Sequence, residues 1–285
     1  MTRLTPHMIR DVPFSSAERD SELIRTLGMT LKGLAYEAVG IDLRQLRMED
    51  YTAAAVPVTS GMGTTEGFSD SVCAIVEHLG MSAFVTDRSD VAGFSEAISA
   101  GADIVFMADD DEFVAFNCRT RTFSNNTRST ALGYFTALRV AADGLRGREV
   151  LLIGAGRVGT YAAELLDRER AKVTVVDMDR SRAEALKKAH DNFRVKYDLM
   201  DAVMESGLIF NASPARVPGE WIREGAIISS PGMPFSFDDE GLRRVGTLIH
   251  DPLQIGVSVM AVWSAGKSLS QISIPEGREI KMEAI

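Results

Sequence analysis

The fold of this chain is decided by the stretch Val150-Leu151-Leu152-Ile153-Gly154-Ala155-Gly156-Arg157-Val158-Gly159. Four consecutive apolar residues predict a buried strand, and glycines with the spacing GxGxxG follow it directly. The next residues, Thr160 to Leu166, are amphipathic and predict a helix. A strand, a glycine turn and a helix in this order are typical of the first unit of a Rossmann domain.

The glycines of this turn suit a dinucleotide site. Gly154 permits the tight turn, Gly156 lets the backbone approach a pyrophosphate, and Gly159 lets the helix pack closely on the strand. The N–H groups at the start of the helix then hold the phosphates. The structural alternative is a glycine turn that serves only the fold. We predict that the whole turn binds the cofactor through Gly154, Ala155, Gly156, Arg157, Val158 and Gly159.

The strand after this unit ends in an acidic residue that favours NAD over NADP. Lys172 to Val176 predicts the strand, and Asp177 follows it. A carboxylate at this point accepts hydrogen bonds from the adenosine ribose hydroxyls and repels a 2′-phosphate, although Arg180 and Arg182 lie close by. Two turns after later strands are expected to border the nicotinamide half of the cofactor, through Ala212, Ser213, Pro214, Pro231 and Gly232.

A length of 285 residues predicts two α/β domains. We place an N-terminal substrate-binding domain with leading helices at 1–143, a doubly wound parallel Rossmann domain at 144–266 and a C-terminal tail at 267–285. In the first domain, short apolar runs alternate with amphipathic segments, which implies parallel strands joined by helices. Strands are predicted at 53–58, 83–85 and 103–107, and helices at 16–27, 30–39, 68–79, 91–100 and 127–141. The connecting helix, 127–141, has Asn126 or Thr127 as its expected cap.

Composition excludes several other classes of protein. A net charge of −9 disfavours a nucleic-acid partner, because phosphate binding needs clustered Lys and Arg. Apolar runs are too short to span a bilayer, and the first residues are too polar for a signal peptide. The two cysteines, Cys73 and Cys118, have no metal-binding spacing, so we predict no metal site and a cytoplasmic protein.

A first polar turn of the N-terminal domain is Thr59-Ser60-Gly61-Met62-Gly63, between a predicted strand and a predicted helix. A helix start with a hydroxyl and two glycines suits a carboxylate or phosphate, and a flexible strand–helix turn is the structural alternative. Asp109-Asp110-Asp111 follows the third strand. One of these carboxylates is suited to pair with a substrate amine, and the alternatives are an acidic cap for a following helix or a divalent cation site.

Two further polar pairs lie at element ends that should face the same cleft. Asn125-Asn126 starts the connecting helix, and we expect one of these amides only to cap that helix. His250-Asp251 ends the last predicted strand. The histidine has a suitable pKa for a general base, but a lone histidine in this position is more often structural.

These stretches together resemble the pyrrolysine synthase family, from about Leu4 to Trp263. Besides the glycine turn, the likeness is carried by Val56-Pro57-Val58-Thr59-Ser60-Gly61-Met62-Gly63, Phe84-Val85-Thr86-Asp87, Asp90-Val91-Ala92-Gly93, Met107-Ala108-Asp109-Asp110, Asn125-Asn126, Ser230-Pro231-Gly232-Met233-Pro234 and Asp251-Pro252-Leu253. The resemblance implies NAD-dependent oxidation of the terminal amine of 3-methyl-D-ornithyl-N6-L-lysine. The resulting imine or aldehyde then closes to the pyrroline ring of L-pyrrolysine, and ammonia is released.

The resemblance also implies how the substrate is held. Its implied binding residues are Leu4, Ser60, Phe68, Asp109, Asn126 and Asp251. Leu4 would belong to an N-terminal helix that closes over the ligand, and Asp251 stands where the family has glutamate, so its contact with the amine is expected to pass through water. As catalytic residues, Asp109 and Asp251 would hold the amino groups and stabilise the developing positive charge. A homodimer is the expected assembly.

Two rival functions remain at this stage. Another two-domain amino-acid dehydrogenase, or one of shikimate type, would be expected to show a lysine–aspartate pair in the first domain. Lys32 is the only lysine before Lys172, and it lies in a predicted helix rather than at a strand end. A non-catalytic NAD-sensing module would need no polar substrate turns at Ser60 and Asp109.

Overall fold

The computed structural model describes residues 4–266, and the predicted tail at 267–285 lies outside them. The second lobe is a six-stranded sheet of β6 (Glu149–Ile153), β7 (Lys172–Val176), β8 (Phe193–Val195), β9 (Leu208–Asn211), β10 (Ile227–Ser229) and β11 (Thr247–Ile249). The strand order is β11-β10-β9-β6-β7-β8, and every pair is parallel. The chain builds outward from β6 in one direction and then in the other, so the predicted doubly wound sheet is confirmed, with its switch point between β6 and β9.

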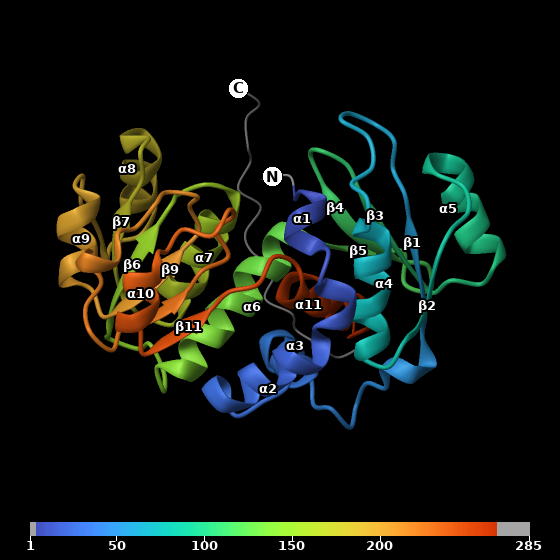
Figure 1. Ribbon diagram of the computed structural model, residues 1–285, viewed down its shortest axis with the longest axis horizontal. Helices are drawn as coiled ribbons and strands as arrows, with labels where there is room; N and C mark the ends of the chain where they lie inside the picture. Colours follow the sequence, from blue (N-terminus) through green and yellow to red (C-terminus); the bar gives the residue numbers. More distant parts are fainter. Residues whose placement is uncertain (1–3, 267–285) are drawn as a thin grey trace.

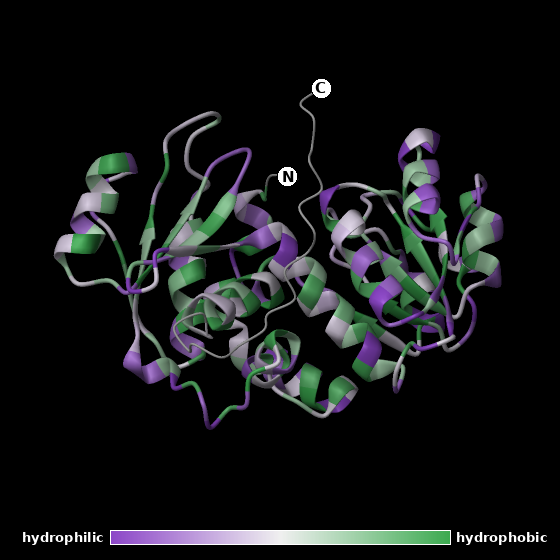
Figure 2. Cartoon of the chain, turned by 180° about the vertical axis from the view of Figure 1, so that it is seen from behind, coloured by the Kyte–Doolittle hydropathy of each residue, from purple (hydrophilic) through white to green (hydrophobic). Residues whose placement is uncertain are grey.

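Helices cover both faces of this sheet because each strand carries apolar side chains on both sides. On one face α7 (Arg157–Arg168) and α8 (Arg180–Ala189) share an apolar core with β6 and β7. On the other face α9 (Leu199–Glu205) and the turn η3 (Gly219–Trp221) pack in a second core, and α10 (Asp239–Arg244) lies against η3. Figure 2 shows the apolar strands, in green, enclosed by helices with polar residues on their outer sides.

The first lobe is a five-stranded mixed sheet of β1 (Thr52–Val56), β2 (Ser82–Val85), β3 (Ile104–Ala108), β4 (Phe113–Asn117) and β5 (Thr122–Asn125), in the order β2-β1-β3-β4-β5. The first three strands are parallel, as predicted, and α4 (Phe68–His78) and α5 (Asp90–Ser99) pack on opposite faces. Strand β4 runs antiparallel to both of its neighbours, β3 and β5. The alternative of a helix after Asp111 is therefore wrong, because alternating burial from Phe113 to Asn117 forms a strand instead.

The helix predicted at 16–27 is confirmed as α2 (Ser16–Leu27), and the one predicted at 30–39 is α3 (Leu31–Val39), which begins one residue later. The short helices α1 (Pro6–Ile9) and η1 (Val12–Phe14) precede them, and η2 (Met48–Asp50) follows. Gly28 and Gly40 end α2 and α3 with φ of 72° and 75°, the left-handed conformation that favours glycine. Thr30 caps α3, because its side chain accepts a hydrogen bond from the Gly33 N–H at 3.1 Å.

Two long helices join the lobes. In Figure 1, α6 (Asn126–Ala141) and α11 (Gln254–Gly266) lie between the two sheets, above α2 and α3. Helix α11 is almost wholly buried and shares the core of the first lobe, so part of the range 144–266 packs with the N-terminal domain. The two helices cross closely at small residues, since a Cβ on Gly133 would lie 2.5 Å from Ile255 Cγ2. Within residues 4–266 no helix combines the length and apolarity needed to cross a membrane.

Candidate active site

One cleft of about 640 Å³ opens between the two lobes. Both sheets contribute turns from the carboxyl ends of their parallel strands, which is where doubly wound sheets bind ligands. Of the residues predicted for a binding role, the cleft is lined by Leu4, Phe68, Asp109, Asn126, Gly156, Arg157, Val158, Ala212, Pro214, Pro231, Gly232 and Asp251. The structure places Ser60, Gly154, Ala155, Gly159, Asp177 and Ser213 outside this lining set.

The glycine turn has the geometry that a dinucleotide requires. Gly154 has φ of 95°, and a Cβ on Gly159 would lie 1.9 Å from the Gly154 carbonyl oxygen, so helix α7 can approach β6 only with glycine there. Gly156 is different, because a Cβ on it would meet no protein atom within 4 Å. Gly156 lines the cleft at the N-terminus of α7, where N–H groups and the helix dipole favour a phosphate.

Asp177 follows β7 and holds the glycine turn. Its Oδ2 accepts a hydrogen bond from the Ala155 N–H at 2.6 Å, and its Oδ1 accepts one from the Asp179 N–H at 2.7 Å. Each carboxylate oxygen keeps a second acceptor site for a ribose hydroxyl. Arg182 lines the cleft nearby and forms an ion pair with Asp179 at 3.3 Å.

Two carboxylates of the first lobe accept hydrogen bonds from the 59–63 turn, one near each end of it. Asp90 accepts hydrogen bonds from the Thr59 N–H at 2.8 Å and the Thr59 hydroxyl at 2.5 Å. Asp110 Oδ2 accepts one from the Met62 N–H at 2.8 Å. The turn is therefore held in shape. Ser60 is exposed and does not line the cleft, whereas Met62 and Gly63 of the same turn do.

Asp109 lies at the start of the tight β3–β4 turn and lines the cleft. Its Oδ1 accepts hydrogen bonds from the N–H groups of Glu112 and Asp111, each at 2.8 Å. These backbone donors, Glu112 first, lower the pKa of Asp109 below its usual range. The carboxylate is thus held ionised in the lining of the cleft. In the described part of the chain, no group of three His, Cys, Asp or Glu side chains is placed to hold a metal ion.

The two asparagines at the start of α6 have separate roles. Asn125 caps the helix, because its Oδ1 accepts a hydrogen bond from the Arg128 N–H at 2.9 Å. The predicted cap at Asn126 or Thr127 is therefore wrong by one or two residues. Asn126 lines the cleft instead, and its Oδ1 accepts from the Thr130 hydroxyl at 3.2 Å. A Cβ on Gly256 would lie 2.7 Å from that same oxygen, so α11 passes directly beside Asn126.

Apolar side chains line the cleft on the side of the first lobe. Phe68, the first residue of α4, packs edge-on against Phe113 with ring centroids 5.2 Å apart. Leu4 packs on the same core just before α1, and its carbonyl accepts a hydrogen bond from the Thr65 hydroxyl at 3.4 Å. Leu4 therefore lines the cleft from two residues before α1, not from within an N-terminal helix as the resemblance implies.

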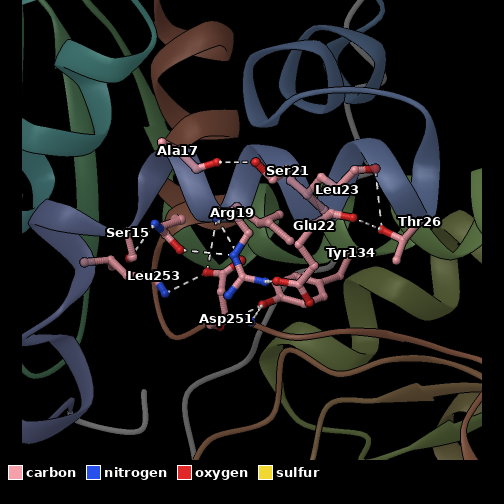
Figure 3. A network of polar contacts seen from close by, with 12 residues as sticks. Ser15, Ala17, Arg19, Ser21, Glu22, Leu23, Thr26, Tyr134, Asp251 and Leu253 are labelled. Carbon is pink, nitrogen blue, oxygen red and sulfur yellow. Dashed lines mark hydrogen bonds and ion pairs between the residues drawn. The ribbon is translucent and has the colours of Figure 1, made fainter.

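Asp251 lies deeper than the sequence suggests. It is only 4 % exposed, and its carboxylate accepts hydrogen bonds from the N–H groups of Leu253 at 2.9 Å and Ile255 at 3.3 Å, so it caps α11. In Figure 3 the Arg19 side chain extends from α2 toward Asp251 and Tyr134. The Tyr134 hydroxyl donates to the Asp251 carbonyl at 2.7 Å. Asp251 still lines the cleft, but a large part of its hydrogen-bonding capacity serves the fold.

The structural interpretation of His250 fits its surroundings better than catalysis. Its Nδ1 lies 2.7 Å from the Ser230 carbonyl oxygen, which requires the proton on that nitrogen. Its ring packs on Phe235, with centroids 4.8 Å apart. Burial lowers the pKa of His250 below its usual value of 6.5, so the ring stays neutral, and it does not line the cleft.

Several lining residues were not predicted from the sequence, namely Met62, Thr65, Thr130, Tyr134, Arg182 and Met233. Thr130 and Tyr134 follow Asn126 at helical spacing, so the face of α6 that carries Asn126 could have been extended to them. Met233 belongs to a turn that was singled out only for its proline and glycine. No lysine lines the cleft in the part of the chain that the structure describes, and Lys32 pairs with Glu49 at 3.2 Å elsewhere.

The fold and the cleft define a two-domain dehydrogenase with an NAD(P)-binding second domain. Residues 137–218 match the family model described as shikimate / quinate 5-dehydrogenase, and residues 8–124 match the one described as pyrrolysine biosynthesis protein PylD, N-terminal domain. The chain is 32 % identical over 265 residues to the pyrrolysine synthase of Methanosarcina acetivorans, which covers 91 % of this chain and 98 % of that one. It is 31 % identical over 266 residues to the pyrrolysine synthase of Methanosarcina barkeri, with coverage of 91 % and 97 %. The chain belongs to the pyrrolysine synthase family.

Solved structures share the fold at much lower identity. A shikimate dehydrogenase from Aquifex aeolicus superposes with a TM-score of 0.52 at 12 % identity, over 78 % of this chain and 98 % of that one. A quinate dehydrogenase from Corynebacterium glutamicum, in complex with NAD, gives 0.51 at 13 % identity, over 76 % and 94 %. These likenesses confirm the domain order and the sheet architecture.

Proposed function

We propose that this protein oxidises the terminal amine of 3-methyl-D-ornithyl-N6-L-lysine with NAD and thereby forms the pyrroline ring of L-pyrrolysine. The observation that carries the proposal is the continuous cleft that runs from the glycine turn at Gly156 to Asp109 and Asn126. Membership of the pyrrolysine synthase family supports this substrate. The absence of a lining lysine among the described residues weighs against a lysine–aspartate mechanism of shikimate type.

The reaction balances in two stages. The carbon that bears the terminal amine loses a hydride and its nitrogen loses a proton, which leaves a carbon–nitrogen double bond. The ornithine α-amine then attacks that carbon, either directly or after hydrolysis to the aldehyde. The ring closes as a cyclic imine, and the terminal nitrogen leaves as ammonia. When bound, NAD supplies the two-electron acceptor for the first stage.

The residues of this chain would act by position and charge. Asp109 is held ionised by backbone donors and is suited to bind a substrate amino group and to stabilise the positive charge that develops at the oxidised carbon. Asn126 offers an amide on the facing helix. Asp251 would reach the amine end through water, since its own carboxylate caps α11. Phe68 and Leu4 would exclude bulk water before the ring closes.

Asp177 supports NAD as the form of the cofactor. Its carboxylate lies against the glycine turn, where the adenosine ribose of a bound dinucleotide would be placed, and an added 2′-phosphate would meet its negative charge. Arg182, which also lines the cleft, is paired with Asp179 and so is partly neutralised. We therefore expect NAD to be preferred and NADP to be used poorly.

The test is to incubate the purified protein with the methylornithyl-lysine dipeptide and NAD, following NADH absorbance and identifying the cyclised product by mass spectrometry. We expect NADH and pyrroline product in equal amounts. Asp109→Asn should lower kcat/KM by at least about a hundredfold, because one charge-assisted contact to a developing cation is lost. Asp111→Asn, which neutralises the exposed acid two residues on, should change it little. Absence of NADH and product from the wild-type protein would overturn the proposal.

A further inference from the structure

The side chain of Arg157 leaves the glycine turn and crosses the cleft. Its Nη1 donates a hydrogen bond to the Asp111 carbonyl oxygen at 2.7 Å, and its Nη2 forms an ion pair with the Glu112 carboxylate. Arg157 is the first residue of α7 in the second lobe, whereas Asp111 and Glu112 form the β3–β4 turn of the first. A guanidinium has five donors, so these two contacts leave others for a phosphate.

Arg157 contacts the same β3–β4 turn whose N–H groups orient the Asp109 carboxylate. The N–H groups of Asp111 and Glu112 both donate to Asp109 Oδ1, and Asp110 in the same turn holds the Met62 N–H. One side chain from the dinucleotide domain therefore contacts the peptide groups that orient the proposed substrate carboxylate. The contact also neutralises Glu112, whose charge would otherwise repel a pyrophosphate at the start of α7.

We propose that Arg157 is a positioning residue that couples the two halves of the site, and that it acts through Glu112. With a dinucleotide bound, the guanidinium lies between its phosphates and Glu112, and the Asp109 turn is held in the geometry that receives the substrate amine. Dinucleotide binding thus orders the substrate site. The role in substrate binding rests on the function proposed above, whereas the ordering of the turn does not depend on it.

The ordering is tested by hydrogen exchange of a peptide spanning residues 108–113, with and without saturating NADH. In the wild-type protein, NADH should slow exchange of the Asp111 and Glu112 amides. Glu112→Gln should abolish that slowing. Glu37→Gln is the matched control, because Glu37 is also 48 % exposed and pairs with an arginine, Arg139, away from the cleft.

Kinetics distinguish positioning from a merely structural role. Glu112→Gln should raise KM for the dipeptide about fivefold, which is about 1 kcal/mol and the upper end for an exposed ion pair. The value of kcat should stay within about twofold, because a loosened turn weakens ground and transition states alike. Arg157→Lys should keep part of the effect, since lysine retains the charge but not the two-pronged geometry.

Two results would overturn the inference. One is NADH-dependent protection in Glu112→Gln equal to that of Glu37→Gln. The other is lost protection with an unchanged KM for the dipeptide, which would make the contact structural only. If the wild-type protein does not oxidise the dipeptide, the proposed function fails, and the exchange measurement still decides whether Arg157 and Glu112 order the turn.

Discussion

The glycine turn allows a substitution that separates cofactor binding from folding. Gly156 has φ of −78° and ψ of −167°, an extended conformation that alanine adopts freely, and an added Cβ would meet no protein atom within 4 Å. Gly156→Ala should therefore fold. Alanine gains about 0.4–1 kcal/mol by restricting the unfolded chain but is a poorer helix N-cap than glycine, and these effects offset each other to within about 1 kcal/mol.

The same methyl group would occupy the space into which a pyrophosphate must come. Placing an extra methyl in a filled site costs about 1–3 kcal/mol, so the affinity for NADH should fall by about 5-fold to 150-fold. Gly159→Ala is the contrasting variant, in which we expect the added methyl to disturb folding. Its Cβ would start 1.9 Å from the Gly154 oxygen and needs at least 3.0 Å, so α7 must move away from β6. That displacement should cost about 3 kcal/mol of folding stability.

The assay pairs urea unfolding with a fluorescence titration of NADH for both variants. Gly156→Ala should keep the wild-type unfolding midpoint and lose affinity, whereas Gly159→Ala should lose stability. If Gly156→Ala binds NADH as tightly as the wild-type protein, then Gly156 does not face the dinucleotide. If it unfolds as easily as Gly159→Ala, the open space beside it does not exist. Either result would refute the reasoning.

Two further predictions concern a helix cap and a buried histidine. Asn125→Ala should lower the free energy of unfolding by about 1 kcal/mol, because the Arg128 N–H loses its acceptor. Asn125→Asp keeps an acceptor and should change that free energy by a few tenths of a kcal/mol at most. Equal losses for the two variants in urea unfolding would contradict this prediction. Burial lowers the pKa of His250, so the unfolded state binds more protons at this site, and stability should fall as the pH drops below about 6.5. His250→Gln should flatten this part of the stability profile, and an unchanged slope would show that other groups cause it.

Local patterns were sufficient for much of the fold and for the geometry of the glycine turn. The apolar run before Gly154, the spacing of the three glycines and the acid at Asp177 lie within one βαβ unit, so neighbours in sequence determine their geometry. Helix ends at Gly28 and Gly40 were equally predictable, because a left-handed residue is a local requirement. The β4–β5 hairpin was missed, since its strands are short and no turn residues of the usual hairpin type mark it.

Other features depended on contacts between distant segments. The sequence placed Asp109 and Asp251 at strand ends, but only the tertiary structure decided that one faces the cleft with donors behind it and that the other is buried as the cap of α11. The same holds for Arg157, whose partners lie 46 and 45 positions away. The sequence determines the charge and the length of each side chain. Which group it meets is set by how two sheets and the helices between them pack, and no local pattern encodes that.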